Sequence, residues 1–202
     1  VSQKKVYQYI DNNIFLTKKL LEIPHKRFIF ISSVDIYPTD RKKHYENDNI
    51  FLNDSNSIYS MSKITCENMI REHCKNHVIL RVSGMLGPKI RDNAMMKIYK
   101  NSLNKSFNRL TLHGDSEFNY VLQSDILKLI NKLIKNNDCG TYNVCSNRNI
   151  TLKKISEYFG STIKFGNYKY MVGKNINKKV VKKYGLFNKT SLQTIKEFVS
   201  EF

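Results

Sequence analysis

The sequence predicts an α/β fold built around a parallel β-sheet. The segments 27–33 and 77–82 each hold a continuous apolar run bounded by turn formers, which is typical of strands buried on both faces. Between them, 58–75 carries apolar residues at helical spacing. Strand, helix and strand with short connections indicate a parallel crossover, in which helices cover the sheet.

A helix, a long loop and a turn are predicted for the segments around these two strands. Residues 5–22 are predicted to form a helix that leads into the first strand after Pro24. The polar segment 38–57 is predicted to be an irregular loop of a length that indicates either function or disorder. A turn at Gly87 and Pro88 ends the second strand region.

The second half of the chain is predicted to mix helices and short strands. Its apolar spacing predicts helices at 93–103, 123–137, 151–159 and 191–202, and strands at 109–114, 118–122, 141–145 and 162–166. Thr151 is the predicted N-cap of the third of these helices. Residues 166–189, rich in Lys, Asn and Gly, are predicted to be a mobile loop.

Composition bounds the class of protein. With 202 residues, 41% of them apolar, the chain can bury one sizeable core, or one core with a small lobe. No apolar run approaches the roughly 20 residues that span a bilayer, and the start is neither a signal peptide nor a methionine. The four cysteines lack CxxC or zinc-type spacing, so we expect reduced thiols, no metal site and a cytoplasmic location.

The formal charge of +17 raises nucleic acid as a partner. The lysines, however, occur in pairs along the whole chain, among many Asn, Ile and Tyr residues. This spread favours a compositional bias over a binding patch, so nucleic acid is disfavoured as a partner. An anionic small ligand is compatible with both interpretations.

Polar side chains follow directly on the first apolar run. Ser32, Ser33 and Asp35 come where the strand ends, and ligands of parallel sheets bind just beyond the carboxyl ends of the strands. These residues are therefore candidates for a site. The alternative is that the serines and Asp35 merely begin a turn by binding nearby backbone amides.

Tyr59 and Lys63 are four residues apart, so they share one face of the predicted helix. A nearby ammonium lowers the pKa of a phenol from its usual value of about 10, which would make Tyr59 a general acid or base. Ser33 could bind the same substrate oxygen. A solvated Tyr and Lys pair without function has the same spacing.

The order of five segments carries a resemblance to a known family. The segments "FIFISSVDIYP", "YSMSK", "ILRVSGMLGP", "LHGDSEFNYVLQSDI" and "GTYNVCSNRNITLKKISE" together resemble the NAD-dependent epimerase/dehydratase family of extended short-chain dehydrogenase/reductases. The resemblance implies the carboxyl-terminal part of a Rossmann-type sheet with a small mixed α/β substrate lobe. It implies a partial Rossmann-type domain at 1–90, a substrate-binding lobe at 91–118 and 147–202, and a return to the first domain at 119–146.

The resemblance also implies roles for individual residues. Ser33, Tyr59 and Lys63 match the family's catalytic hydroxyl, its acid/base tyrosine and the lysine that contacts the nicotinamide ribose. Asp35 lies where some members carry a proton-transferring residue, so it is either a catalytic base or a turn residue. The implied cofactor is NAD or NADP, bound by Asn13, Ser32, Tyr59 and Lys63.

The sequence also departs from the family pattern. It has no GxxGxxG turn to hold the dinucleotide phosphates, so by the resemblance it starts near the helix before the domain's fifth strand. The family's substrate-binding asparagine falls on Gly84, and its phosphate-binding arginine falls on Phe118. Arg109 or a lysine would have to replace that arginine, and the implied substrate-binding set is Ser33, Gly84 and Arg109.

Two functions remain open at this point. In the first, the chain is a truncated or partial nucleotide-sugar epimerase, dehydratase or reductase with Ser-Tyr-Lys chemistry at a sugar C4 position, complemented by a separate amino-terminal segment or chain and able to form a homodimer. In the second, it is an inactive relative that acts as a binding or interaction protein, with nucleic acid as one partner of its basic surface.

Overall fold

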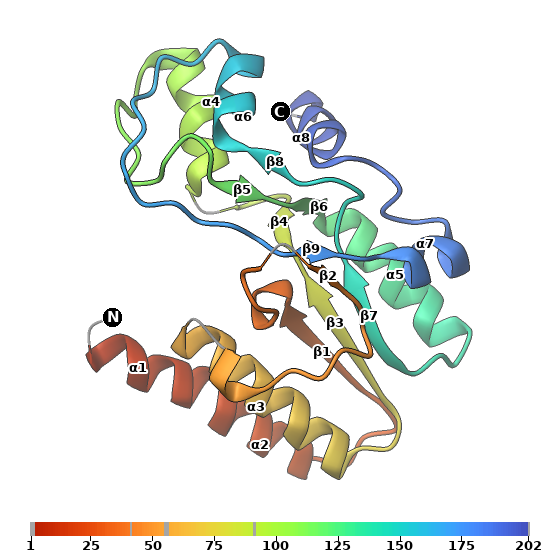
Figure 1. Ribbon diagram of the computed structural model, residues 1–202. Coiled ribbons are helices and arrows are strands. Elements are labelled where there is room, and N and C mark those ends of the chain that lie inside the picture. Colours follow the sequence, from red (N-terminus) through yellow and green to blue (C-terminus); the bar gives the residue numbers. More distant parts are fainter. Residues whose placement is uncertain (1–2, 41, 55–56, 91, 202) are drawn as a thin grey trace.

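The computed structural model describes residues 3–40, 42–54, 57–90 and 92–201. Within these residues the central sheet is parallel and has the strand order β1 (Phe28–Ser33), β3 (His77–Val82) and β7 (Gly140–Val144). Figure 1 shows the three strands side by side between two layers of helices. The predicted α/β fold with a parallel sheet is confirmed.

The two faces of this sheet pack against different helices. Alternate side chains, such as Ile31, Leu80 and Tyr142, form one apolar cluster with α5 (Gln123–Lys135) and α7 (Lys178–Tyr184). The opposite face is covered by α3 (Ile58–His73), which Ser57 caps at its N-terminus. The carboxyl end of β1 and the first turn of α3 therefore lie close together.

The amino-terminal helix differs from a regular α-helix. It consists of α1 (Gln3–Tyr9), a π-helical segment η1 (Ile10–Phe15) and α2 (Leu16–Glu22), which lie against α3. Phe15, Leu16 and Leu20 are exposed by 53%, 48% and 42% of their surface. The apolar spacing predicted a helix here, but much of its apolar surface is not buried by the described residues.

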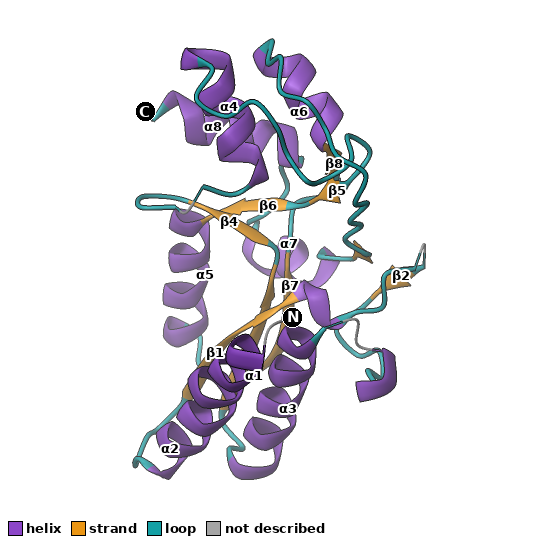
Figure 2. Cartoon of the chain, turned by 90° about the vertical axis from the view of Figure 1, so that its left-hand side faces the viewer, coloured by secondary structure: helices purple, strands orange, loops and turns teal. Residues whose placement is uncertain are grey.

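A second group of elements lies beyond the carboxyl end of the sheet (Figures 1 and 2). It contains two small strand pairs, parallel β4–β6 and antiparallel β5–β8, and three helices that share one apolar cluster. Thr151 caps α6 as predicted. The elements are β4 (Gly84–Leu86), α4 (Ala94–Asn104), β5 (Glu117–Phe118), β6 (Tyr120–Leu122), β8 (Ile150–Thr151), α6 (Leu152–Phe159) and α8 (Ser191–Ser200). The domain boundaries given above stay a prediction.

Two predictions about the second half were wrong. The segment 166–189 is not a single loop, because it contains β9 (Lys174–Asn175) and α7, whose Val180 and Tyr184 are buried against the sheet. Lysines surround these two side chains in the sequence and hide their helical spacing. The predicted strands 109–114 and 162–166 form only isolated bridges to neighbouring segments, one of which joins Arg109 to Lys164.

The polar segment after β1 is ordered by pairing and stacking. Its short strand β2 (Lys43–His44) pairs in parallel with β9, and η2 (Val34–Ile36) and η3 (Leu52–Asp54) are single 3-10 turns. The buried His44 ring stacks on Tyr37 at a centroid distance of 5.0 Å. The alternative of disorder is therefore wrong for the described part of this segment. Across the described residues, no helix combines the length and the apolar character that a membrane span requires.

A buried carboxylate joins α3 to the sheet. Glu67 is 1% exposed and accepts hydrogen bonds from Ser32 Oγ at 2.6 Å, Arg81 Nη2 at 2.8 Å and Arg71 Nη2 at 2.7 Å. Burial by itself raises the pKa of Glu67, but the hydrogen bond and charge of Arg81, aided by Ser32 and Arg71, hold this pKa below its ordinary 4.5.

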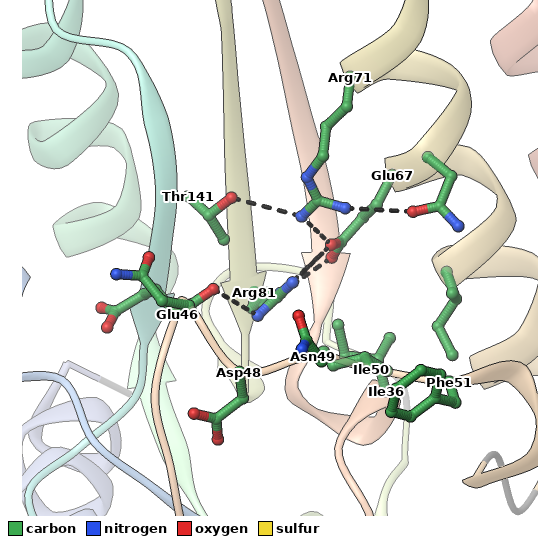
Figure 3. A pocket seen from close by; sticks show the side chains of 13 residues that line it. Ile36, Glu46, Asp48, Asn49, Ile50, Phe51, Glu67, Arg71, Arg81 and Thr141 are labelled. Carbon is green, nitrogen blue, oxygen red and sulfur yellow. Dashed lines mark hydrogen bonds and ion pairs between the residues drawn. The ribbon is translucent and has the colours of Figure 1, made fainter.

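Figure 3 shows Glu67, Arg71 and Arg81 in the wall of a cavity of about 470 Å³ between α3, β3, β7 and the segment around Glu46. Arg81 also donates to the backbone oxygen of Glu46, and Arg71 lies close to Thr141. The charged groups in this wall mostly bind one another, and the cavity holds none of the predicted catalytic residues. We therefore assign this cluster to folding.

Glu67→Gln should lower the free energy of unfolding by roughly 3–5 kcal/mol, because it leaves the Arg81 guanidinium buried without its counterion. Urea unfolding at neutral pH measures this loss. The matched control is Glu72→Gln, which changes an exposed carboxylate on the same helix and should leave the stability nearly unchanged.

The pH dependence tests the same interaction. Since the folded pKa of Glu67 lies below its unfolded value, its stabilisation is complete above about pH 5 and is lost as the pH falls through the folded pKa. Wild type should therefore lose more stability than Glu67→Gln between about pH 5 and pH 3. Equal slopes for the two proteins would contradict this account.

Candidate active site

A cavity of about 420 Å³ opens at the carboxyl edge of the sheet. Its walls come from the end of β1, the first turns of α3, the β3–β4 junction and two segments of the second group of elements. Of the predicted site residues, it brings together Ser32, Ser33, Asp35, Tyr59, Lys63 and Gly84. Asn13 and Arg109 do not line it.

Tyr59 lies in the first turn of α3, where the Ser57 side chain accepts from the backbone N–H of Ser60. Burial raises the pKa of Tyr59, a hydrogen bond with Ser33 opposes the rise, and the charge of Asp35 adds to it. The expectation that Lys63 lowers this pKa was wrong, because burial is the largest effect and raises the pKa. The Lys63 Nζ lies 5.9 Å from the Tyr59 ring centroid and donates its hydrogen bond elsewhere.

Lys63 points back along the sheet. Its Nζ donates to the backbone oxygen of Ile31 at 3.1 Å and lies 4.8 Å from the centroid of the Phe30 ring. Burial lowers the pKa of Lys63, and nearby Glu67 raises it in part. Tyr59 and Lys63 thus share a helix face as predicted, but no direct hydrogen bond joins them.

Ser33 and Asp35 do form a turn. The Ser33 Oγ accepts from the backbone N–H of Asp35 at 3.1 Å, which caps η2. This is the turn role that the sequence left open, and it does not exclude a role in a site, because both side chains also line the cavity. The Asp35 carboxylate accepts a hydrogen bond of 2.6 Å from the hydroxyl of Tyr170.

Tyr170 was missed from the sequence. It lies in the segment that was predicted to be a loop, and its ring stacks on Phe118 at 4.8 Å. The Ser116 Oγ accepts from its backbone N–H at 3.1 Å. Burial and the charge of Asp35 raise the pKa of Tyr170, so it stays a hydrogen-bond donor at neutral pH. The short apolar run Tyr170, Met171 and Val172 inside a lysine-rich stretch was the sequence signal of a packed segment, and Val172 is indeed buried.

The pair of Asp35 and Tyr170 also borders a second cavity of about 360 Å³. This cavity is lined by the N-terminal end of α3 and by the segment around Lys169, and it shares Val34 and Val172 with the first cavity. Both volumes fall within the range of about 300–1,000 Å³ that is usual for ligand pockets. The two cavities therefore adjoin at the Asp35 carboxylate, which Tyr170 hydrogen-bonds.

The other three predicted site residues, Ser32, Asn13 and Arg109, contact residues that do not line this cavity. The Ser32 Oγ donates to Glu67, although the residue borders the cavity. The Asn13 Nδ2 donates to the Ser62 Oγ at 2.8 Å, which ties η1 to α3. Arg109 lies in the bridge to Lys164. Their roles toward cofactor and substrate stay predictions.

Gly84 is required by a close approach of two strands. Its backbone N–H donates to the Asn119 oxygen at 2.9 Å. A Cβ atom at this position would lie 2.9 Å from the Tyr120 ring and 3.0 Å from that oxygen, so a larger side chain needs a backbone shift. An asparagine at position 84 would therefore require Tyr120 or the Asn119 backbone to move. The described residues hold no group of three or more His, Cys, Asp or Glu placed to bind a metal.

Comparisons with known proteins place this geometry in a family. The family model described as the NAD dependent epimerase/dehydratase family matches residues 1–145. No curated protein matches the chain.

Several solved structures are similar. One is UDP-glucuronic acid 4-epimerase from Bacillus cereus in complex with NAD, with a TM-score of 0.76, 19% identity, and coverage of 100% of this chain and 71% of that chain. Another is UDP-N-acetylglucosamine 4-epimerase from Methanobrevibacter ruminantium, crystallised with UDP-N-acetylmuramic acid (TM-score 0.73, 19% identity, coverage 97% and 71%). A third is dTDP-4-dehydrorhamnose reductase from Bacillus anthracis in complex with NADP (TM-score 0.71, 19% identity, coverage 87% and 66%).

At these identities the solved structures establish the fold, and they confirm that the parallel sheet is of the Rossmann type. The family match is the stronger observation, because it extends over more than half of the chain and includes β1, α3, β3 and β7. We conclude that the chain belongs to the NAD dependent epimerase/dehydratase family.

Proposed function

We propose that the chain acts on a nucleotide sugar, with NAD or NADP as cofactor, and that Ser33, Tyr59 and Lys63 carry the chemistry at the sugar C4 position. The observation that carries the proposal is the convergence of these residues with Asp35 in one cavity at the carboxyl edge of a parallel sheet. The family supports an enzyme of this class, and the similar solved structures bind NAD, NADP and UDP-sugars.

The cofactor fits part of this site. The cavity offers an ammonium from Lys63 and a phenol from Tyr59, a donor set suited to the hydroxyls of a nicotinamide ribose. The sequence contains no GxxGxxG turn, so these residues account for the nicotinamide half and not for the pyrophosphate. When bound, the nicotinamide would supply hydride acceptance and donation.

Tyr59 is the acid/base residue in this proposal. Its raised pKa keeps the phenol protonated at neutral pH in the free protein, so it is ready to donate a proton to a sugar oxygen. Acting as a base requires a positive charge close to the phenol, and the candidate is the Lys63 ammonium, whose Nζ lies 5.9 Å from the Tyr59 ring centroid. Ser33, which hydrogen-bonds Tyr59, orients the same oxygen.

Asp35 decides between reaction types. A carboxylate beside the reacting carbon removes a proton in a dehydratase or in an epimerase that acts next to a carbonyl, whereas a 4-epimerase or a ketone reductase needs no such base. The hydrogen bond from Tyr170 holds the carboxylate in one orientation at the cavity wall. We therefore include Asp35 among the catalytic candidates, with Tyr170 as its positioning residue.

Tyr59→Phe should lower turnover roughly 10²- to 10⁴-fold, because it removes the proton-transfer group and keeps the ring. Affinity for the dinucleotide should change little, whereas Lys63→Ala should lower both turnover and affinity. The assay follows conversion of UDP-glucuronic acid at saturating NAD. Tyr158→Phe is the matched control, because Tyr158 is 44% exposed on α6 and lines neither cavity. Equal turnover of Tyr59→Phe and wild type would overturn the proposal.

Asp35→Asn separates the reaction types. If Asp35 is a base, the variant should lose the exchange of solvent deuterium into the sugar, which NMR or mass spectrometry detects, and Tyr170→Phe should reduce the same exchange. If Asp35 is a turn residue, the exchange and the rate should stay at the wild-type level. That result would favour reduction or 4-epimerisation without an added base.

A further inference from the structure

Tyr9 is the last residue of α1, and its ring lies against the ring of Tyr59. The two ring centroids are 5.7 Å apart, and the ring planes form an angle of 56°. Tilted aromatic rings at centroid distances of about 4.5–7 Å attract one another beyond the apolar area that they bury. Tyr9 does not line the candidate active site, so it contacts Tyr59 from outside that cavity.

A second contact fixes the same part of α3, beside which the end of α1 lies (Figure 1). The Asn13 Nδ2 donates to the Ser62 Oγ at 2.8 Å, and that hydroxyl donates to the backbone oxygen of Tyr59 at 2.7 Å. Tyr9 directly precedes the π-helical segment η1, and Asn13 lies within it. Such segments are rare and occur frequently at functional sites. One short stretch of chain therefore contacts Tyr59 at its ring and, through Ser62, at its backbone.

The contact bears on the acid/base chemistry of Tyr59. Burial is the largest cause of the raised pKa of Tyr59, and the phenol of Tyr9 is one of the smaller causes. Because the Tyr9 ring covers part of the Tyr59 ring, it also contributes to that burial. Without Tyr9, water reaches the Tyr59 ring, and the side chain is free to take other rotamers.

We propose that Tyr9 is a positioning residue for Tyr59, whose ring it holds in the orientation in which the Tyr59 hydroxyl meets Ser33 in the cavity. The inference rests on the proposed function, because only there does Tyr59 have an acid/base role. Since Tyr9 lies outside the cavity, it acts through Tyr59 and not on the substrate.

The first test measures the ionisation of Tyr59 and needs no turnover. In the full chain with tyrosine labelled with carbon-13 at Cζ, NMR follows each phenol as the pH rises, and the Tyr59 signal is the one that Tyr59→Phe lacks. In Tyr9→Ala this phenol should ionise at a lower pH than in wild type, because the charged form is better hydrated. Tyr9→Phe should lie close to wild type, because it keeps the ring.

The second test measures turnover of UDP-glucuronic acid at saturating NAD. Turnover of Tyr9→Ala should fall roughly 10- to 100-fold, because a misplaced catalytic group costs rates of this order. Tyr9→Phe should again stay close to wild type. A residue that only stabilised the fold would change neither the ionisation of Tyr59 nor the rate of the folded enzyme.

Tyr7→Ala is the matched control. It makes the same substitution two residues earlier on α1, where the side chain is 57% exposed. Both the ionisation of Tyr59 and the turnover should stay at the wild-type level. The inference is overturned if Tyr9→Ala behaves as Tyr7→Ala does, or if Tyr9→Ala loses stability in urea while Tyr59 ionises as in wild type.

Tyr59→Phe separates failure of this inference from failure of the proposed function. If Tyr59→Phe loses turnover while Tyr9→Ala changes neither turnover nor the ionisation of Tyr59, only the inference on Tyr9 fails. If Tyr59→Phe keeps wild-type turnover, the proposed function fails and the acid/base part of this inference fails with it, even where Tyr9→Ala shifts the ionisation.

Discussion

The buried carboxylate of Glu67 fixes the relation between helix α3 and the central sheet. It accepts from Ser32 at the end of β1 and from Arg81 near the end of β3, and it lies on the same helix as Tyr59 and Lys63. Glu67 therefore ties the strand that carries Ser33 to the helix that carries Tyr59. Buried ionic groups are costly to desolvate, and here several donors compensate for that cost and select a single docking of the helix.

The rest of the candidate site depends on segments that are distant in the sequence. Asn119 and Phe118 reach the cavity from the β5–β6 region, and Tyr170 reaches it from the stretch before β9. Tyr170 is held in place by a stacked ring and by Ser116, and it then holds Asp35. The central sheet thus positions the hydroxyls and the ammonium, whereas the second group of elements positions the carboxylate.

Patterns of short range predicted the three strands of the central sheet and the helix that carries Tyr59 and Lys63, because apolar runs and four-residue spacing reflect local geometry. The Asp35–Tyr170 pair was beyond such patterns, since it joins positions 135 residues apart. The direction in which the Tyr59 pKa shifts was also predicted wrongly. Spacing showed that Lys63 shares the helix face, but not that its ammonium binds Ile31 or that burial outweighs its charge. The role of Glu67 was hidden because a lone acidic residue on a helix usually faces water.

The bond from Lys63 to Ile31 has a consequence for self-association. In the described sheet β1 is an outer strand. The backbone N–H of Phe28 donates toward β3, and successive residues of a strand direct their backbone groups to alternate sides. The backbone groups of Ile31, three residues later, therefore face away from β3, toward the open side of β1. An open strand side is a template for intermolecular β-pairing, and proteins guard such sides with lysines. The Lys63 ammonium occupies one of the carbonyls that an incoming strand would need. Lys63 therefore lies where it can hinder intermolecular pairing of β1, independently of its role in the proposed chemistry.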